Sequence, residues 1–132
     1  MKFMLMMNTP RGDGDYGVKA WKPEELKAHI GFMKTFIGQL KQEGVLVAAE
    51  GLAPPGQARI VRAGKGATPE VTDGPFAESK EFLAGYWIVD VESPAQAYAI
   101  AARASAAPGS GGKPMNMAIE VREVASAPPV EV

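Results

Sequence analysis

The sequence predicts an α+β fold of the ferredoxin-like type: a split β-α-β unit with an added β-hairpin and an antiparallel sheet that carries two helices on one face. Three observations predict this fold. The 132-residue chain opens with an apolar run, two segments have helical periodicity, and short strands separated by turn residues lie between them. We expect a single domain over residues 1–125 and a frayed C-terminal tail over 126–132.

The first two predicted elements are a buried strand and an amphipathic helix. Phe3–Met7 is apolar at every position, which is typical of a central strand covered on both faces. Pro23 opens a helix that Gly44 ends, and its apolar residues recur at spacings of three and four. The predicted buried stripe consists of Leu26, Ile30, Met33, Ile37 and Leu40.

The middle of the chain has the pattern of short strands separated by turns. Two of these strands flank the glycine-rich loop 64–69 and form the added hairpin. The strands of this part are predicted over residues 45–49, 58–63, 70–72 and 85–91.

The last part of the chain predicts a second helix and a closing strand. Ser93 caps a helix that has Pro94 at its first position and runs to about Ala107, and a strand follows over 117–124. Each helix has a single apolar stripe, so both must cover the same face of the sheet. Because the first strand is apolar on both sides, the opposite face needs a cover as well, and we expect a homodimer that pairs sheet to sheet.

The composition excludes several classes of protein. Hydrophobic residues make up 46% of the chain and charged residues 22%, as in globular domains, and a net charge of −1 argues against nucleic acid or anionic membrane as a direct partner. With no cysteine and one histidine, we expect no metal and no cofactor. The loop 109–113 lacks the spacing of a phosphate-binding motif. Neither a signal peptide nor an apolar run long enough to span a bilayer is apparent, so a cytoplasmic protein is expected.

One segment of the chain carries a family resemblance. Residues 71–81 read Val-Thr-Asp-Gly-Pro-Phe-Ala-Glu-Ser-Lys-Glu, and Gly85-Tyr86-Trp87 follows shortly after. Asp-Gly-Pro alone predicts a bend between two strands. The whole string resembles the signature of the DGPF-domain proteins, part of the YCII-related family. Further similar stretches are Met1–Met7, His29–Met33, residues 44–47, 50–55 and 118–122.

This resemblance implies a fold more firmly than a reaction. Related families form dimeric α+β barrels, whereas most YCII-related proteins have no assigned activity. Relatives of the domain occur near or fused to alternative sigma factors. The resemblance therefore implies either a small enzyme, of isomerase, lyase or hydrolase type, or a non-catalytic ligand-binding or regulatory dimer linked to sigma-factor-dependent transcription. In both of these cases a small molecule would bind in the dimer cavity, and a purely structural dimer is the third alternative.

His29 is the single histidine and the first candidate for a functional residue. It lies about 40° from Met33 on a helical wheel and should point toward the sheet or its edge. The residues alone leave two interpretations open, a hydrogen-bonded core histidine and an acid–base group. YCII-related proteins have been proposed to use a histidine–aspartate pair, and the resemblance implies that Asp73 is the partner of His29.

Four further residues are candidates for ligand binding. Phe76 should be packed in the bend, and Asp90 shares a strand face with Tyr86 and Ile88. Glu120 and Arg122 should line the open face of the sheet. There Arg122 could clamp a carboxylate or phosphate, or form a structural ion pair with Glu120.

Overall fold

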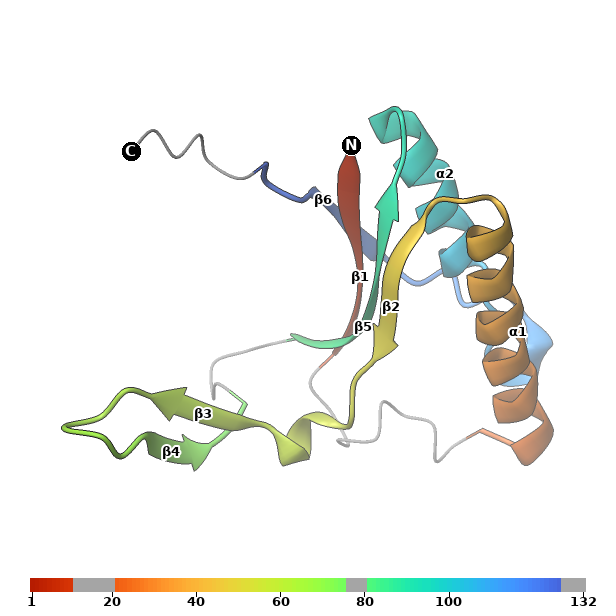
Figure 1. Cartoon of the computed structure of the whole chain (residues 1–132). Helices are drawn as coiled ribbons and strands as arrows, with labels where there is room; N and C mark the ends of the chain where they lie inside the picture. The colour runs from red at the N-terminus through yellow and green to blue at the C-terminus, as the bar shows by residue number, and fades with distance from the viewer. Residues whose placement is uncertain (11–20, 76–80, 127–132) are drawn as a thin grey trace.

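A computed structural model of the chain describes residues 1–10, 21–75 and 81–126. It has a four-stranded antiparallel sheet in the order β2-β5-β1-β6, two α-helices and a separate two-stranded hairpin (Figure 1). The elements are β1 Lys2–Pro10, α1 Pro23–Gln42, β2 Leu46–Gly51, the 3₁₀ turn η2 Pro55–Gln57, β3 Arg59–Arg62, β4 Glu70–Asp73, β5 Glu81–Asp90, α2 Pro94–Ser105, the 3₁₀ turn η3 Ser110–Gly112 and β6 Ile119–Glu123. The predicted ferredoxin-like α+β fold with an added hairpin is confirmed.

Strand β1 is an inner strand of the sheet, as its apolar sequence predicts. It pairs with β5 on one side and β6 on the other, so that Leu5 lies between Trp87 and Val121. Phe3 and Leu5 are buried against the helices. Met4 and Met6 alternate to the opposite face, where they are half-buried.

Both helices lie on the same side of the sheet (Figure 1). The buried face of α1 is rotated from the predicted stripe, since Phe36 and Leu40 are buried while Ile30 is 44% exposed. The prediction was wrong for Ile30 because the aromatic ring of Phe36 takes the centre of the contact, with its centroid 5.7 Å from that of Trp87. Within the described residues, neither helix has an apolar stretch long enough to cross a bilayer.

Helix α2 begins and packs as its sequence predicts. The Ser93 hydroxyl accepts a hydrogen bond from the Gln96 amide at 3.3 Å, which caps the first turn. The buried face consists mainly of small residues, so the helix can lie close to β1 and β6: Ala97, Ile100, Ala101 and Ala104.

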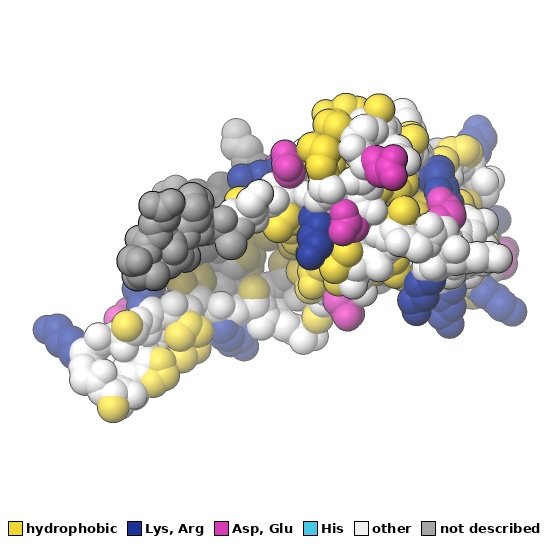
Figure 2. Space-filling view, turned by 45° about the horizontal axis from the view of Figure 1, so that its top comes forward, with side chains coloured by type: hydrophobic (Ala, Val, Ile, Leu, Met, Phe, Trp, Pro, Cys, Tyr) yellow, Lys and Arg dark blue, Asp and Glu magenta, His cyan; other side chains and the backbone are white. Residues whose placement is uncertain are grey.

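The hairpin β3–β4 projects from the sheet as a narrow extension (Figure 1). All of its strand residues are exposed except Ile60, which is half-buried, and the facing pair Val61 and Val71 is 61% and 55% exposed. Figure 2 shows apolar side chains on the surface of this extension. At the base, the Gly74 amide donates to the Ala58 carbonyl at 2.9 Å, and the Gly74–Pro75 peptide is cis.

Candidate functional site

A pocket of about 330 Å³ lies between α1 and the edge of the sheet formed by β2 and β5. Its apolar walls come from both layers, the helix and the sheet. His29 is the titratable side chain that α1 contributes to it. The lining residues are Met7, His29, Met33, Ile37, Ala49, Glu50, Gly51, Gly85, Tyr86 and Trp87.

Two glycines create the floor of this pocket. Gly51 and Gly85 are cross-strand partners on the face that α1 covers, two positions along the strands from the pair of Ala49 and Trp87. A Cβ atom on Gly51 would meet no atom within 4 Å, whereas a Cβ on Gly85 would lie 3.0 Å from the Glu50 carbonyl oxygen. The sheet therefore lacks side chains at this point, and a volume large enough for a ligand remains below the helix.

The histidine ring is held by two contacts outside the pocket. Its Nδ1 lies 2.9 Å from the carbonyl oxygen of Pro108, and Trp21 packs edge-on against the ring at a centroid distance of 5.3 Å. A carbonyl oxygen only accepts hydrogen bonds, so Nδ1 carries the proton in this contact. In the neutral ring Nε2 is then the unprotonated nitrogen, and it has no hydrogen-bond partner among the described residues.

The Pro108 carbonyl is positioned by the loop over residues 108–114. Pro108 and Pro114 form a β-bridge, and within the loop the Gly109 amide donates to the Lys113 carbonyl at 2.8 Å. The Glu25 carboxylate joins this loop to α1, because it accepts hydrogen bonds from the amides of both Lys22 and Gly111. These two bonds hold the pKa of Glu25 below its ordinary value, and the bond from the Lys22 amide has the larger effect.

The other predicted catalytic residue, Asp73, lies in a different part of the molecule. It is in the hairpin, where its carboxylate is 3.6 Å from Arg59 and its side chain is 95% exposed. The hairpin and α1 extend to opposite sides in Figure 1. Within a single chain, Asp73 therefore does not lie near His29, because Asp73 belongs to the separate sheet of the hairpin. A catalytic role for the two residues stays a prediction.

The four predicted ligand-binding residues are not near His29 or lie outside the described residues. The Asp90 carboxylate is 3.2 Å from the amino group of Met1, at the C-terminal end of β5 and five residues beyond Gly85. Glu120 and Arg122 lie opposite Met6 and Met4 on the open face, as predicted. In the described part of the chain these two residues form no ion pair. Phe76 lies outside the described residues.

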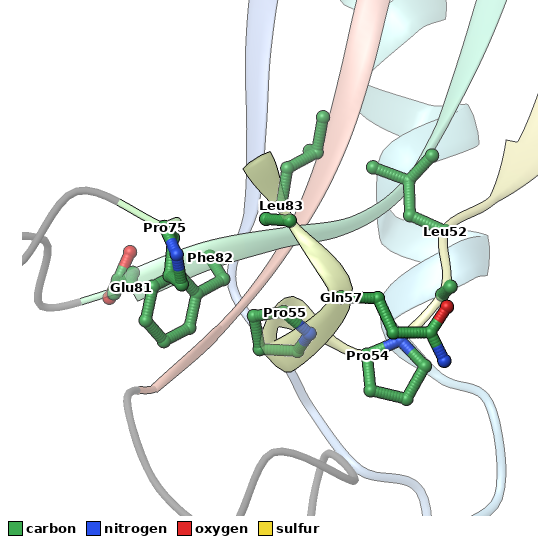
Figure 3. Close-up of a pocket in the computed structure, with 10 residues that line it drawn as sticks. Leu52, Pro54, Pro55, Gln57, Pro75, Glu81, Phe82 and Leu83 are labelled. Carbon is green, nitrogen blue, oxygen red and sulfur yellow. The ribbon is translucent and has the colours of Figure 1, made fainter. Parts of the chain in front are cut away.

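A second pocket, of about 460 Å³, lies at the base of the hairpin (Figure 3). Its walls are formed by prolines and apolar side chains, including Pro54, Pro55, Pro75 and Leu83. Glu81 is the titratable residue among those that line it. Among the described residues, no contact fixes the orientation of the Glu81 carboxylate, whereas the Pro108 carbonyl fixes that of His29 in the pocket beside α1.

Sequence reasoning missed the residues that complete the His29 site. The Pro108 carbonyl is a backbone group 79 residues away from His29, and no side-chain motif can indicate it. Gly85 did carry a signal, since a glycine inside a strong strand often marks the close approach of a backbone or ligand.

Comparison with known proteins places this site within a family. No curated protein matches the chain. The sequence model of the YCII-related domain matches residues 1–112, a range that contains β1 to η3 and with them His29, the pocket and residues 108–112 of the loop. This match covers most of the 132 residues. The chain therefore belongs to the YCII-related family.

Proposed function

We propose that the protein is a small homodimeric enzyme of the acid–base type, in which His29 moves a proton on a small molecule bound beside α1. One observation carries this proposal. The His29 ring borders a pocket of about 330 Å³, and because the Pro108 carbonyl, 2.9 Å from Nδ1, occupies that nitrogen, Nε2 is the ring nitrogen left for a ligand.

The chemistry follows from the two ring nitrogens. When Nε2 takes a proton from the ligand, the ring becomes an imidazolium, and the bond from Nδ1–H to the Pro108 carbonyl becomes a stronger, charge-assisted one. The same Nε2 then returns the proton to another atom of that molecule, as in an isomerase, or to a leaving group, as in a lyase. In a hydrolase the proton would come instead from a bound water that attacks the ligand. The apolar walls formed by Met33, Ile37 and Trp87 limit the access of water.

The proposal does not require a carboxylate on the ring. A histidine base needs a partner that fixes its tautomer, and the backbone carbonyl of Pro108 can do this in place of an aspartate. Asp73 stays a predicted catalytic residue. Asp73→Asn tests it, and activity unchanged by this substitution would remove it from the site.

His29→Gln is the direct test of the proposal. The glutamine amide N–H can still donate to the Pro108 carbonyl, so we expect a melting temperature close to that of the wild type. A screen of metabolites by thermal shift should find compounds that stabilise the wild type and lose that effect in the variant. Lys27→Gln, at an exposed position of the same helix, should keep every hit.

Two outcomes would redirect the proposal. Hits that stabilise His29→Gln as well as the wild type would show that the histidine does not contact the ligand. Hits that need His29 but stay chemically unchanged after long incubation, followed by NMR, would favour the alternative of a non-catalytic ligand-binding or regulatory dimer.

The dimer part of the proposal concerns the open face of the sheet. Met4 and Ile88 are cross-strand partners there, as are Met6 and Tyr86, and no described helix lies on this face. A second copy would remove this apolar row from water. Light scattering should give twice the chain mass for the wild type and a monomer for Ile88→Lys. A monomeric wild type at micromolar concentration would contradict the dimer and leave the His29 test unaffected.

A further inference from the structure

We infer that the pocket beside α1 takes an uncharged, mainly apolar small molecule that donates a hydrogen bond, such as an alcohol or an amide N–H, to Nε2 of His29. This inference rests on the proposed function, because it names the class of ligand for the same pocket. Three features of the site support it: the tautomer of the ring, the glycine floor and the charge of the walls.

The tautomer of the His29 ring requires a ligand that donates a hydrogen bond. The Pro108 carbonyl can only accept, and it lies 2.9 Å from Nδ1. The neutral ring therefore offers a lone pair at Nε2 and no second N–H. A ligand group that only accepts hydrogen bonds, such as an ether or ketone oxygen, would leave Nε2 unsatisfied, and a hydroxyl or amide N–H would satisfy it.

The surrounding contacts keep the ring in this state. Trp21 packs against the His29 ring in a T-shaped arrangement, with the two ring centroids 5.3 Å apart. This contact restricts rotation of the imidazole ring. Glu25 fixes the 108–114 loop through the Gly111 amide, and with it the carbonyl that accepts from Nδ1. The donor requirement therefore comes from the fold itself and does not depend on the arrival of the ligand.

The walls of the pocket offer no charge to pair with an ionic ligand. The side chains that face α1 are apolar, and Glu50 is the charged residue of the lining. Because Ala49 packs against the core, the side chain of Glu50 alternates to the other face of the sheet, and Glu50 contributes its backbone to the pocket. No described lysine or arginine lines the pocket, so a carboxylate or phosphate bound there would lose its hydration without gaining a permanently charged partner.

The glycine floor sets where the apolar body of the ligand lies. The bare backbone of Gly51 and Gly85 faces Met33 and Ile37 across the pocket. A flat or cyclic apolar group fits between these two layers, with its polar group at the His29 end. The volume of about 330 Å³ is at the small end of the range for ligand sites, which suits a molecule with one ring.

Three probes that share a ring and differ in their polar group test this inference. They are cyclohexanol, which donates a hydrogen bond, cyclohexyl methyl ether, which only accepts, and cyclohexanecarboxylate, which is charged. We expect NMR titration of the wild-type protein to show binding of the alcohol roughly five- to tenfold tighter than of the ether, and no binding of the carboxylate. The ¹⁵N resonance of Nε2 of His29 should move with the alcohol.

Two variants locate the binding. His29→Phe keeps a flat ring without an acceptor, so the preference for the alcohol over the ether should disappear. Gly51→Leu should fill the pocket and abolish binding of both neutral probes. Gly38→Leu, in α1 and with open space around its Cβ as at Gly51, should leave binding unchanged.

The failures of the two proposals can be told apart. Equal binding of ether and alcohol, tighter binding of the carboxylate, or no binding of any probe up to its solubility limit would overturn the ligand class. The proposed function depends instead on the unbiased screen with His29→Gln, and its hits would then define another class for the same pocket.

Discussion

The four-stranded sheet and the two helices that pack on it form the α/β body of the molecule. In this body each strand of the sheet has one face against the helices, whereas the β3–β4 hairpin has both faces in solvent. All residues of the buried core that the structure describes belong to the body, and none of the described residues between 41 and 83 is buried. The body holds its shape by packing, and the hairpin holds its shape by strand pairing and by the contact between Gly74 and Ala58 at its base. The first part of the signature, residues 71–75, therefore lies where the described chain has the least buried core, whereas the histidine site is built where it has the most.

The largest expected effect is the loss of an aromatic ring from the body. Phe36 is 2% exposed and contacts Trp87, so Phe36→Ala should lower the free energy of unfolding by about 3–5 kcal/mol. Chemical denaturation measures this change. Ile30→Ala in the same helix, at a residue that is 44% exposed, is the matched control and should cost much less. Equal costs would mean that α1 packs by the stripe predicted from its sequence.

A smaller effect is expected for the ion pair that joins the two helices of the body. Arg103 donates to both oxygens of Glu43 at 2.9 Å and lies over the Phe36 ring at 5.3 Å. Because both side chains are more than a third exposed, Arg103→Ala should cost only about 1 kcal/mol. Lys41→Ala, an exposed lysine in the last turn of α1, is the control.

The same pair predicts a dependence on pH. The hydrogen bonds from Arg103 hold the pKa of Glu43 below its ordinary value. The stability that the pair contributes is therefore present above the ordinary glutamate pKa and is lost as the pH falls through the lowered one. Arg103→Ala should flatten the acid side of the stability curve, and a curve with unchanged slope would contradict the role of the pair.

A local effect is expected at the 108–114 loop, which is largely exposed like the hairpin but is bound to the body. Glu25→Ala removes the acceptor for the Gly111 amide, so this amide should exchange faster with solvent. The ¹⁵N spectrum of His29 should then show a mixture of tautomers, while the melting temperature changes little. Glu24→Ala, the exposed neighbour, should change neither. An unaltered His29 spectrum in Glu25→Ala would show that the loop holds the ring without this contact.

The smallest effect is expected in the hairpin. Val61 and Val71 face each other across the two strands but are 61% and 55% exposed. Changing both to threonine keeps the β-branched shape, and each substitution should alter the free energy of unfolding by no more than about 0.5 kcal/mol. A loss several times larger, or one that depends on protein concentration, would show that the hairpin is covered by a second copy.

The sequence predicted the order of elements well and the site only in part. Periodicity and caps determine where an element lies, so the inner position of Phe3–Met7, the added hairpin and the capping role of Ser93 could all be predicted. The orientation of His29 toward the sheet followed from the same periodicity. The exposure of Ile30 and the position of Asp73 depend on how whole elements pack, and the Pro108 contact depends on a backbone atom, so local patterns could not indicate them.

The distance along the chain between His29 and Pro108 has a consequence for synthesis. A nascent chain that has left the ribosome as far as β5 already contains both glycines of the pocket floor and the whole of α1. It still lacks the 108–114 loop, so nothing yet fixes the proton on Nδ1. In the proposed site, the His29 ring would therefore be oriented only after α2 and the 108–114 loop have been synthesised.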